Sequence, residues 1–145
     1  MREFIIIKPD GVERGLVGEI LKRFEKYGFR IVGLKILNVS KKQAEELYEV
    51  HKGKPFYNDL IEYICSGPVV AGMLQIAVPD ADSVSLVRKI VGETDPAKAA
   101  MGTIRGDFGV SIRRNIIHAS DSRPSRDREM KIFFSDEELV DYPKN

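Results

Sequence analysis

Short apolar runs alternate with amphipathic stretches along this chain, and the alternation restricts it to a small set of folds. Residues 4–7 form an unbroken apolar run of strand-forming side chains, which predicts a strand in the middle of its sheet. Pro9-Asp10-Gly11 follows and should form a turn, because Pro restricts φ and Gly tolerates positive φ. Residues 16–27 carry apolar side chains at helical spacing, and Gly28 is placed to end that helix in the left-handed conformation.

The same reasoning applies to the rest of the chain. It predicts strands over residues 30–39, 69–78 and 115–119. It predicts one helix from the Ser40 capping box to about residue 50 and another whose first turn contains Pro55. It predicts two more helices, one from Asp80 or Asp82 to Gly92 and one from Ser122 to about residue 133. Residues 93–108 should be mostly loop, since they are polar and contain several Gly and Pro, and residues 135–138 resemble a second capping box.

This order of elements favours an α+β fold, a ferredoxin-like α/β sandwich with a mainly antiparallel sheet covered by helices. A doubly wound parallel sheet is the alternative. The length of 145 residues suits a single domain over residues 1–145, and no linker, repeat or low-complexity segment interrupts the pattern.

Charge balance and cysteine content narrow the possible functions. Lys and Arg number 23 against 22 Asp and Glu, so we expect no stable nucleic-acid partner. The chain has 1 cysteine, Cys65, which excludes an internal disulfide and favours a cytoplasmic location. The N-terminal apolar run is too short for a signal peptide or a membrane span, so no membrane partner is expected.

The common nucleotide and metal signatures do not occur in this sequence. It contains no Gly-x-x-x-x-Gly-Lys loop and no Gly-x-Gly-x-x-Gly motif. Its 2 histidines are not spaced as zinc ligands, and the lone cysteine offers no cluster. We therefore expect no metal ion held by protein ligands.

His118 is the residue best suited to chemistry. It lies at the edge of an apolar run, in the segment Asn115-Ile116-Ile117-His118-Ala119-Ser120-Asp121. A neutral imidazole is a good nucleophile toward phosphorus, and it needs an acceptor that orients the ring. Glu129, on the following helix, could supply that acceptor directly or through Ser120. The alternative is a core histidine held by a backbone carbonyl.

Cationic side chains occur at the ends of several predicted elements. Lys8 follows the first strand, Arg88 lies late in a helix, and Arg105 belongs to a glycine-rich stretch, residues 102–107. Backbone amides in such a stretch can approach an anion closely. Phosphoryl transfer needs donors of this kind, because its catalysis is mainly positioning and charge stabilisation. The alternative is that each cation is a solvated surface charge.

Six blocks of the sequence resemble, in order, blocks of the nucleoside diphosphate kinase family. They are residues 7–12, 14–18, 66–70, 92–96, 102–108 and 115–121, and the last of them resembles the family's active-site signature. The resemblance covers nearly the whole chain. It implies an enzyme that transfers the γ-phosphoryl group of a nucleoside triphosphate, mainly ATP, to a nucleoside diphosphate by a ping-pong mechanism.

The resemblance also implies a role for each matched residue. His118 would accept the phosphoryl group, while Glu129, assisted by Ser120, would orient the ring. The side chains that would hold the sugar, the phosphates or the base are Lys8, Tyr48, Phe56, Arg88, Thr94, Arg105, Ile112 and Asn115. Stacking of the base between Phe56 and Ile112 would explain broad base specificity, because every base has a π-face.

The family resemblance further implies Mg²⁺ bound mainly through the nucleotide phosphates, and a homo-oligomer that is a hexamer or a tetramer. The chain departs from the family at residues 75–82, which are longer than expected, and at Met101, where Pro is common. The alternative function is a non-catalytic nucleotide-sensing module on a ferredoxin-like fold, which would need no histidine nucleophile.

Overall fold

The computed structural model describes residues 2–77 and 82–142. Its centre is a four-stranded sheet in the order β2-β3-β1-β4, in which all neighbouring strands are antiparallel. The strands are β1 (Arg2–Ile7), β2 (Arg30–Leu37), β3 (Val69–Gln75) and β4 (Ile117–Ala119). The ferredoxin-like prediction is confirmed, and the parallel, doubly wound alternative is wrong.

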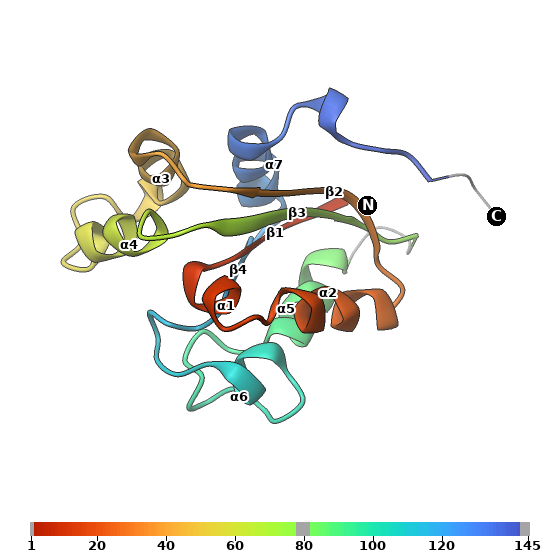
Figure 1. Ribbon diagram of the computed structural model, residues 1–145, viewed down its shortest axis with the longest axis horizontal. Helices are drawn as coiled ribbons and strands as arrows, with labels where there is room; N and C mark the ends of the chain where they lie inside the picture. The colour runs from red at the N-terminus through yellow and green to blue at the C-terminus, as the bar shows by residue number, and fades with distance from the viewer. Residues whose placement is uncertain (1, 78–81, 143–145) are drawn as a thin grey trace.

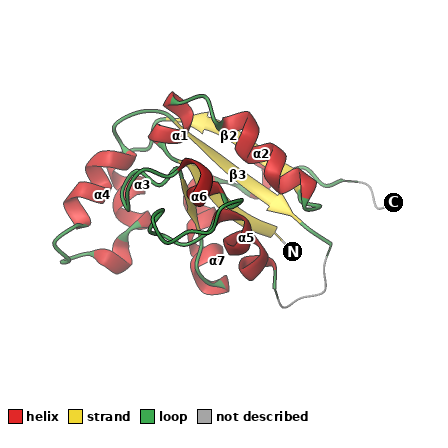
Figure 2. Ribbon diagram, turned by 90° about the horizontal axis from the view of Figure 1, so that it is seen from below, coloured by secondary structure: helices red, strands yellow, loops and turns green. Residues whose placement is uncertain are grey.

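Helices cover both faces of the sheet (Figure 1). One layer contains α1 (Pro9–Glu13), α2 (Val17–Lys26), α5 (Ser83–Val91) and α6 (Ile104–Phe108), and Figure 2 shows α2 and α5 in front of the strands. The other layer contains α3 (Lys41–Leu47), α4 (Tyr57–Ile64) and α7 (Arg123–Phe133). The 3₁₀ turns are η1 (Glu49–His51) and η2 (Asp136–Glu138).

The apolar run in β1 divides its side chains between the two layers. Ile5 and Ile7 pack with α2 and α5, whereas Phe4 and Ile6 pack with α3, α4 and α7. Because side chains alternate along a strand, an unbroken apolar run buries both faces at once. All four side chains are fully buried, which confirms the prediction of a central strand.

The Pro9-Asp10-Gly11 segment is the first turn of α1, and the prediction of a simple turn is wrong. Proline suits the start of a helix because its φ is already helical and the missing N–H has no helical partner there. Gly11 is not needed for a positive φ. A Cβ at that position would lie 2.8 Å from Ile7 Cγ2, so glycine allows α1 to pack closely on β1.

Other element ends differ from the predictions by a few residues. Pro55 precedes α4, which begins at Tyr57, and β2, β3 and β4 are each shorter than predicted. Residues 104–108 form a helix, since Thr103 Oγ1 caps it by accepting from Gly106 N at 3.0 Å. Asp82 occupies the N-cap position of α5 without a side-chain cap, and Asp80 lies outside the described residues, as does part of the long 75–82 segment.

The two predicted capping boxes and the left-handed glycine after α2 are confirmed. Ser40 and Gln43 form a reciprocal capping box at the start of α3, and Ser135 with Glu138 forms another at η2. Gly28 follows α2 with φ of 91°.

Among the described residues, no helix is both long and apolar enough to cross a bilayer.

Candidate active site

A pocket of about 550 Å³ lies where β1 and β4 meet the ends of several helices. The predicted site residues that line it are Lys8, Tyr48, Phe56, Arg88, Thr94, Arg105, Ile112, Asn115, His118 and Glu129. The fold thus brings together side chains that are as much as 121 residues apart in the sequence, the separation from Lys8 to Glu129. Ser120, the remaining predicted residue, is buried against Glu129.

His118 lies on β4 opposite Ile6 of β1, and its side chain is held by α7. Its Nε2 atom is 2.5 Å from Oε1 of Glu129, which is 4% exposed. The hydroxyl of Ser120 donates to the same carboxylate oxygen at 3.1 Å. Both predicted contacts of Glu129 are therefore present, and the alternative of a histidine held by a backbone carbonyl is wrong.

Tyr48 packs beside the imidazole, with its ring edge-on to His118 and 6.2 Å between the ring centroids. Burial raises the pKa of the Tyr48 phenol, and the negative charge of Glu129 adds to the effect. The phenol therefore stays protonated and keeps a hydrogen to donate into the pocket.

Lys8 is positioned by the end of β1 and by Asn115. Its Nζ donates to Asn115 Oδ1 at 2.8 Å, and Asn115 Nδ2 donates to the Thr94 carbonyl at 3.0 Å. Burial lowers the pKa of Lys8 to about 8, and the positive charge of Arg105 contributes to the shift. A cation that is destabilised in this way gains most from an anionic ligand.

Arg105 is a second buried cation. Its Nη2 atom donates to the Ile117 carbonyl at 2.6 Å, and its Nη1 atom donates to the Gly92 carbonyl at 3.2 Å. Burial and the nearby charge of Arg88 lower its pKa to about 10. Its Nε atom is buried without a hydrogen-bond partner among the described residues. The alternative that Lys8 and Arg105 are solvated surface charges is therefore wrong.

The glycine-rich stretch contributes through Arg105 more than through its backbone. Gly102 N donates to Asp107 Oδ1 at 2.9 Å, and Gly106 N donates to Thr103 Oγ1 at 3.0 Å. Both glycine amides are thus engaged within the segment and do not point to a free anion site. The bonds instead fold residues 102–107 into the turn and helix that carry Arg105.

Phe56 and Ile112 line the pocket from different segments of the chain. Phe56 directly precedes α4, and its ring lies 5.4 Å from the His51 ring between centroids. Ile112 is 58% exposed. An ion pair between Asp59 and Arg113, 2.6 Å long, joins the same two segments.

Asp10 supports the site and was missed as a functional residue in the sequence. Its Oδ2 accepts from Ile116 N at 3.1 Å, and Ile116 is fully buried with φ of 77°. Positive φ is costly for a β-branched residue, so it persists only where neighbours hold it. Ile116 joins Asn115 to β4. The available sequence signal was an aspartate three residues after the end of a buried strand.

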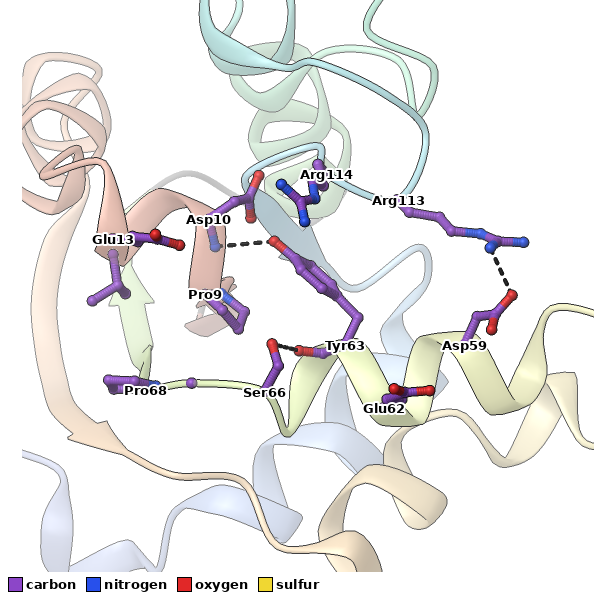
Figure 3. A pocket seen from close by; sticks show the side chains of 12 residues that line it. Pro9, Asp10, Glu13, Asp59, Glu62, Tyr63, Ser66, Pro68, Arg113 and Arg114 are labelled. Carbon is purple, nitrogen blue, oxygen red and sulfur yellow. Dashed lines mark hydrogen bonds and ion pairs between the residues drawn. The ribbon is translucent and has the colours of Figure 1, made fainter.

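A larger pocket of about 790 Å³, which Asp10 also lines, is shown in Figure 3. There Asp10 N donates to the Tyr63 hydroxyl at 3.0 Å, between α1 and α4. Of the 12 lining residues drawn, none is a histidine or a lysine, and carboxylates accompany Arg113 and Arg114. The smaller pocket, which combines His118 with buried cations, is therefore the better candidate for chemistry.

Comparisons with known proteins assign the chain to a family. The sequence model of the family described as nucleoside diphosphate kinase matches residues 1–139. The chain is 56% identical to a nucleoside diphosphate kinase of Thermosipho africanus over 97% of this chain and 93% of the relative. It is 55% identical to one of Ignicoccus hospitalis over 97% of this chain and 92% of that relative.

Solved structures give the same result. A halophilic nucleoside diphosphate kinase from Halobacterium salinarum, solved in complex with CDP, superposes with a TM-score of 0.94 at 42% identity and covers 100% of this chain and 94% of its own. The enzyme from Aquifex aeolicus gives a TM-score of 0.89 at 42% identity, over 96% and 98% of the two chains. The chain therefore belongs to the nucleoside diphosphate kinase family, enzymes that transfer phosphoryl groups between nucleotides.

Proposed function

We propose that the chain transfers the γ-phosphoryl group of a nucleoside triphosphate, mainly ATP, to a nucleoside diphosphate through a phosphorylated His118. The 2.5 Å contact between His118 Nε2 and Glu129 Oε1 carries this proposal. An ionised carboxylate only accepts hydrogen bonds, so Nε2 holds the ring proton and Nδ1 keeps a lone pair. Nδ1 attacks the γ-phosphorus, the bond to the bridging oxygen breaks, and the nucleoside diphosphate leaves.

The second half of the reaction reverses the first with a different nucleotide. A phosphorylated imidazole that keeps its Nε2 proton is cationic in the ring, and the Glu129 carboxylate stabilises that charge. The terminal phosphate oxygen of the incoming diphosphate attacks the phosphorus, and the bond to Nδ1 breaks. One pocket serves both halves because donor and acceptor differ by a single phosphoryl group.

Lys8, Arg88 and Arg105 would bind the phosphates. Burial lowers the pKa values of Lys8 and Arg105, and a nearby cation adds to each shift, Arg105 for Lys8 and Arg88 for Arg105. A bound polyphosphate anion would offset both effects. Charge on the transferring group is stabilised best by donors that are already in place. We also propose that Thr94 contacts phosphate, that Lys8 and Asn115 hold the sugar 3′ hydroxyl, and that Tyr48 donates near the transferring group.

The base would stack between Phe56 and Ile112. Stacking uses the face of a base, which all nucleotides share, and makes little use of the polar edges that distinguish one base from another. The exposed position of Ile112 supports this role. Broad acceptance of different nucleoside diphosphates follows from this arrangement.

Mg²⁺ fits this site as an ion carried by the nucleotide. Within residues 2–77 and 82–142, no cluster of His, Cys, Asp and Glu side chains is arranged to hold a metal ion. The carboxylates that line the pocket belong to Asp121 and Glu129, and Glu129 is already bonded to His118 and Ser120. Phosphate oxygens and water would supply most ligands, and the ion would neutralise phosphate charge.

We further propose a cytoplasmic homo-oligomer, either a hexamer or a tetramer. The free thiol of Cys65 suits a reducing compartment. At the edge of the sheet, β2 exposes Leu34 by 49% and Ile36 by 66%, and an apolar edge strand of this kind favours pairing with another chain.

Intact-mass measurements test the proposed function. The protein is mixed with ATP and magnesium, freed of nucleotide and weighed, and then mixed with GDP and weighed again. We expect a gain of one phosphoryl group that GDP removes, with GTP appearing. A folded parent protein that gains no mass would refute the proposal and favour the nucleotide-sensing module.

Two variants assign the chemistry to residues. His118→Ala should gain no phosphoryl group while it still binds ADP. Glu129→Gln should be phosphorylated about 10- to 100-fold more slowly, the usual cost of losing a partner that orients a reacting group. Phosphorylation of His118→Ala at the parent's rate would place the nucleophile elsewhere.

A further inference from the structure

A buried polar network joins the two helical layers at one edge of the sheet. It consists of Glu3 in β1, Ser83 in the first turn of α5 and Arg126 in α7, all 9% exposed or less. The Oε1 atom of Glu3 accepts hydrogen bonds from the Ser83 hydroxyl and from a guanidinium nitrogen of Arg126, which lies 3.0 Å away. We term these residues the edge network.

The network lies where β4 is too short to cover β1. The residues of β4 pair with Ile5, Ile6 and Ile7, whereas Glu3 pairs only with Leu74 of β3. Because side chains alternate along a strand, Glu3 points to the same layer as Ile5 and Ile7, the layer of α5. Arg126 comes from α7 in the opposite layer and reaches Glu3 past the uncovered edge of β1.

The helices tied together by the network also carry parts of the candidate active site. Arg126 and Glu129 are three residues apart on α7, so their side chains lie on the same side of the helix, about one turn apart. Glu129 reaches His118, while Arg126 reaches Glu3. On the other side of the sheet, Ser83 begins the helix whose Arg88 lines the pocket.

We propose that Glu3 and Arg126 form a positioning pair for phosphoryl transfer, which holds α7 against β1 so that Glu129 stays within hydrogen-bond distance of His118. This inference rests on the proposed function, since it takes His118 as the nucleophile. Neither residue lines the pocket, so the proposed effect on the reaction passes through Glu129, which contacts His118.

Burial makes this pair suitable for positioning. Arg126 is held from two sides, by Glu3 through one guanidinium nitrogen and by Asp127 through Nε at 3.1 Å. Buried ion pairs exchange little with water, and removing one partner leaves the other charge uncompensated. Hydrogen bonds weaken steeply with distance and misalignment, and a misplacement of about 1 Å near reacting atoms costs up to about 100-fold in rate.

The experiment uses the full chain and three variants. Arg126→Met removes the ion pair, and the double variant Glu3→Met/Arg126→Met replaces both charges by apolar side chains that preserve packing. Lys131→Met is the matched control, because Lys131 is an exposed basic residue on the same helix. Each protein is assayed for the single-turnover rate of His118 phosphorylation by ATP, the dissociation constant of ADP, and the proton resonance of the His118–Glu129 hydrogen bond.

The parent protein is measured first, because its phosphorylation tests the proposed function separately. We then expect Arg126→Met to be phosphorylated about 3- to 10-fold more slowly, less than the loss expected for Glu129 itself, with ADP affinity unchanged within about 2-fold. The imidazole proton resonance should move upfield or broaden as its hydrogen bond lengthens. The double variant should fold stably and show the same kinetic and spectroscopic changes, and Lys131→Met should match the parent.

A stable double variant separates positioning from folding, even where Arg126→Met does not fold. Parent-like phosphorylation and an unchanged proton resonance in the double variant would overturn the proposal. Equal slowing by Lys131→Met would also overturn it, because the effect would then follow the charge of the helix. A parent protein that is not phosphorylated on His118 would instead refute the proposed function, and the positioning role would fall with it.

Discussion

Replacing Gly11 by alanine should destabilise the protein, although alanine is normally favoured in a helix. Gly11 lies within α1, where the change alone should stabilise by about 0.5–1 kcal/mol. The added Cβ would lie 2.8 Å from Ile7 Cγ2 and 3.2 Å from both Ile116 Cγ2 and the Ile116 carbonyl oxygen. None of these atoms is the end of a flexible side chain, so the neighbours must shift.

Overpacking of this kind costs about 1–3 kcal/mol and exceeds the gain in helix propensity. We therefore expect a net loss of about 1–2 kcal/mol, which lowers the melting temperature by about 2–8 °C for a chain of this length. The displaced Ile116 also accepts a hydrogen bond from Lys8 N at 2.7 Å and precedes the strand of His118. ADP binding should weaken as well.

Gly18→Ala is the matched control. Gly18 lies in α2, and a Cβ there would meet no heavy atom within 4 Å. The same substitution should therefore stabilise by about 0.5 kcal/mol and leave ADP affinity unchanged. Calorimetric melting and ADP titration of both variants provide the test. A Gly11→Ala protein as stable as the Gly18→Ala protein, with normal ADP affinity, would refute the close-packing argument.

Three further predictions concern nucleotide binding. Because burial and Arg105 lower the pKa of Lys8 to about 8, ADP affinity should fall as pH rises through about 8, and Lys8→Arg should remove this inflection in calorimetric titrations. The free energy of unfolding should instead rise as pH increases above about 8, because the unfolded chain then binds more protons at Lys8 than the folded chain does. Phe56→Ala should weaken equilibrium binding of ADP, GDP and CDP alike by about 5- to 150-fold, which corresponds to about 1–3 kcal/mol for one stacked base. A loss confined to one base would contradict stacking. Asp59→Asn breaks an exposed ion pair with Arg113 and should change the free energy of unfolding by less than about 0.5 kcal/mol. ADP release, measured by stopped flow, should become about 2- to 5-fold faster at low salt only. An equal effect at high salt would exclude the ion pair as its cause.

Features that depend on neighbours in the chain could be predicted from the sequence. The Ser40 capping box, the left-handed Gly28 and the fully buried run in β1 are all determined within a few residues. The segment around His118 also indicates a candidate nucleophile, through its resemblance to the family's active-site signature. Pro9-Asp10-Gly11 is the counterexample, since proline and glycine suit both a turn and the first turn of a packed helix.

The tertiary structure alone decided which groups meet and how strongly they are perturbed. Glu3 and Arg126 are 123 residues apart, and nothing local to either residue indicates that they pair. The lowered pKa of Lys8 likewise depends on burial beneath distant segments and on the charge of Arg105. The sequence by itself thus determined most of the elements, the family and which side chains are candidates for the chemistry. Their distances, burial and protonation depend on long-range packing, because desolvation and charge interactions are set by every atom that surrounds a group in the folded chain.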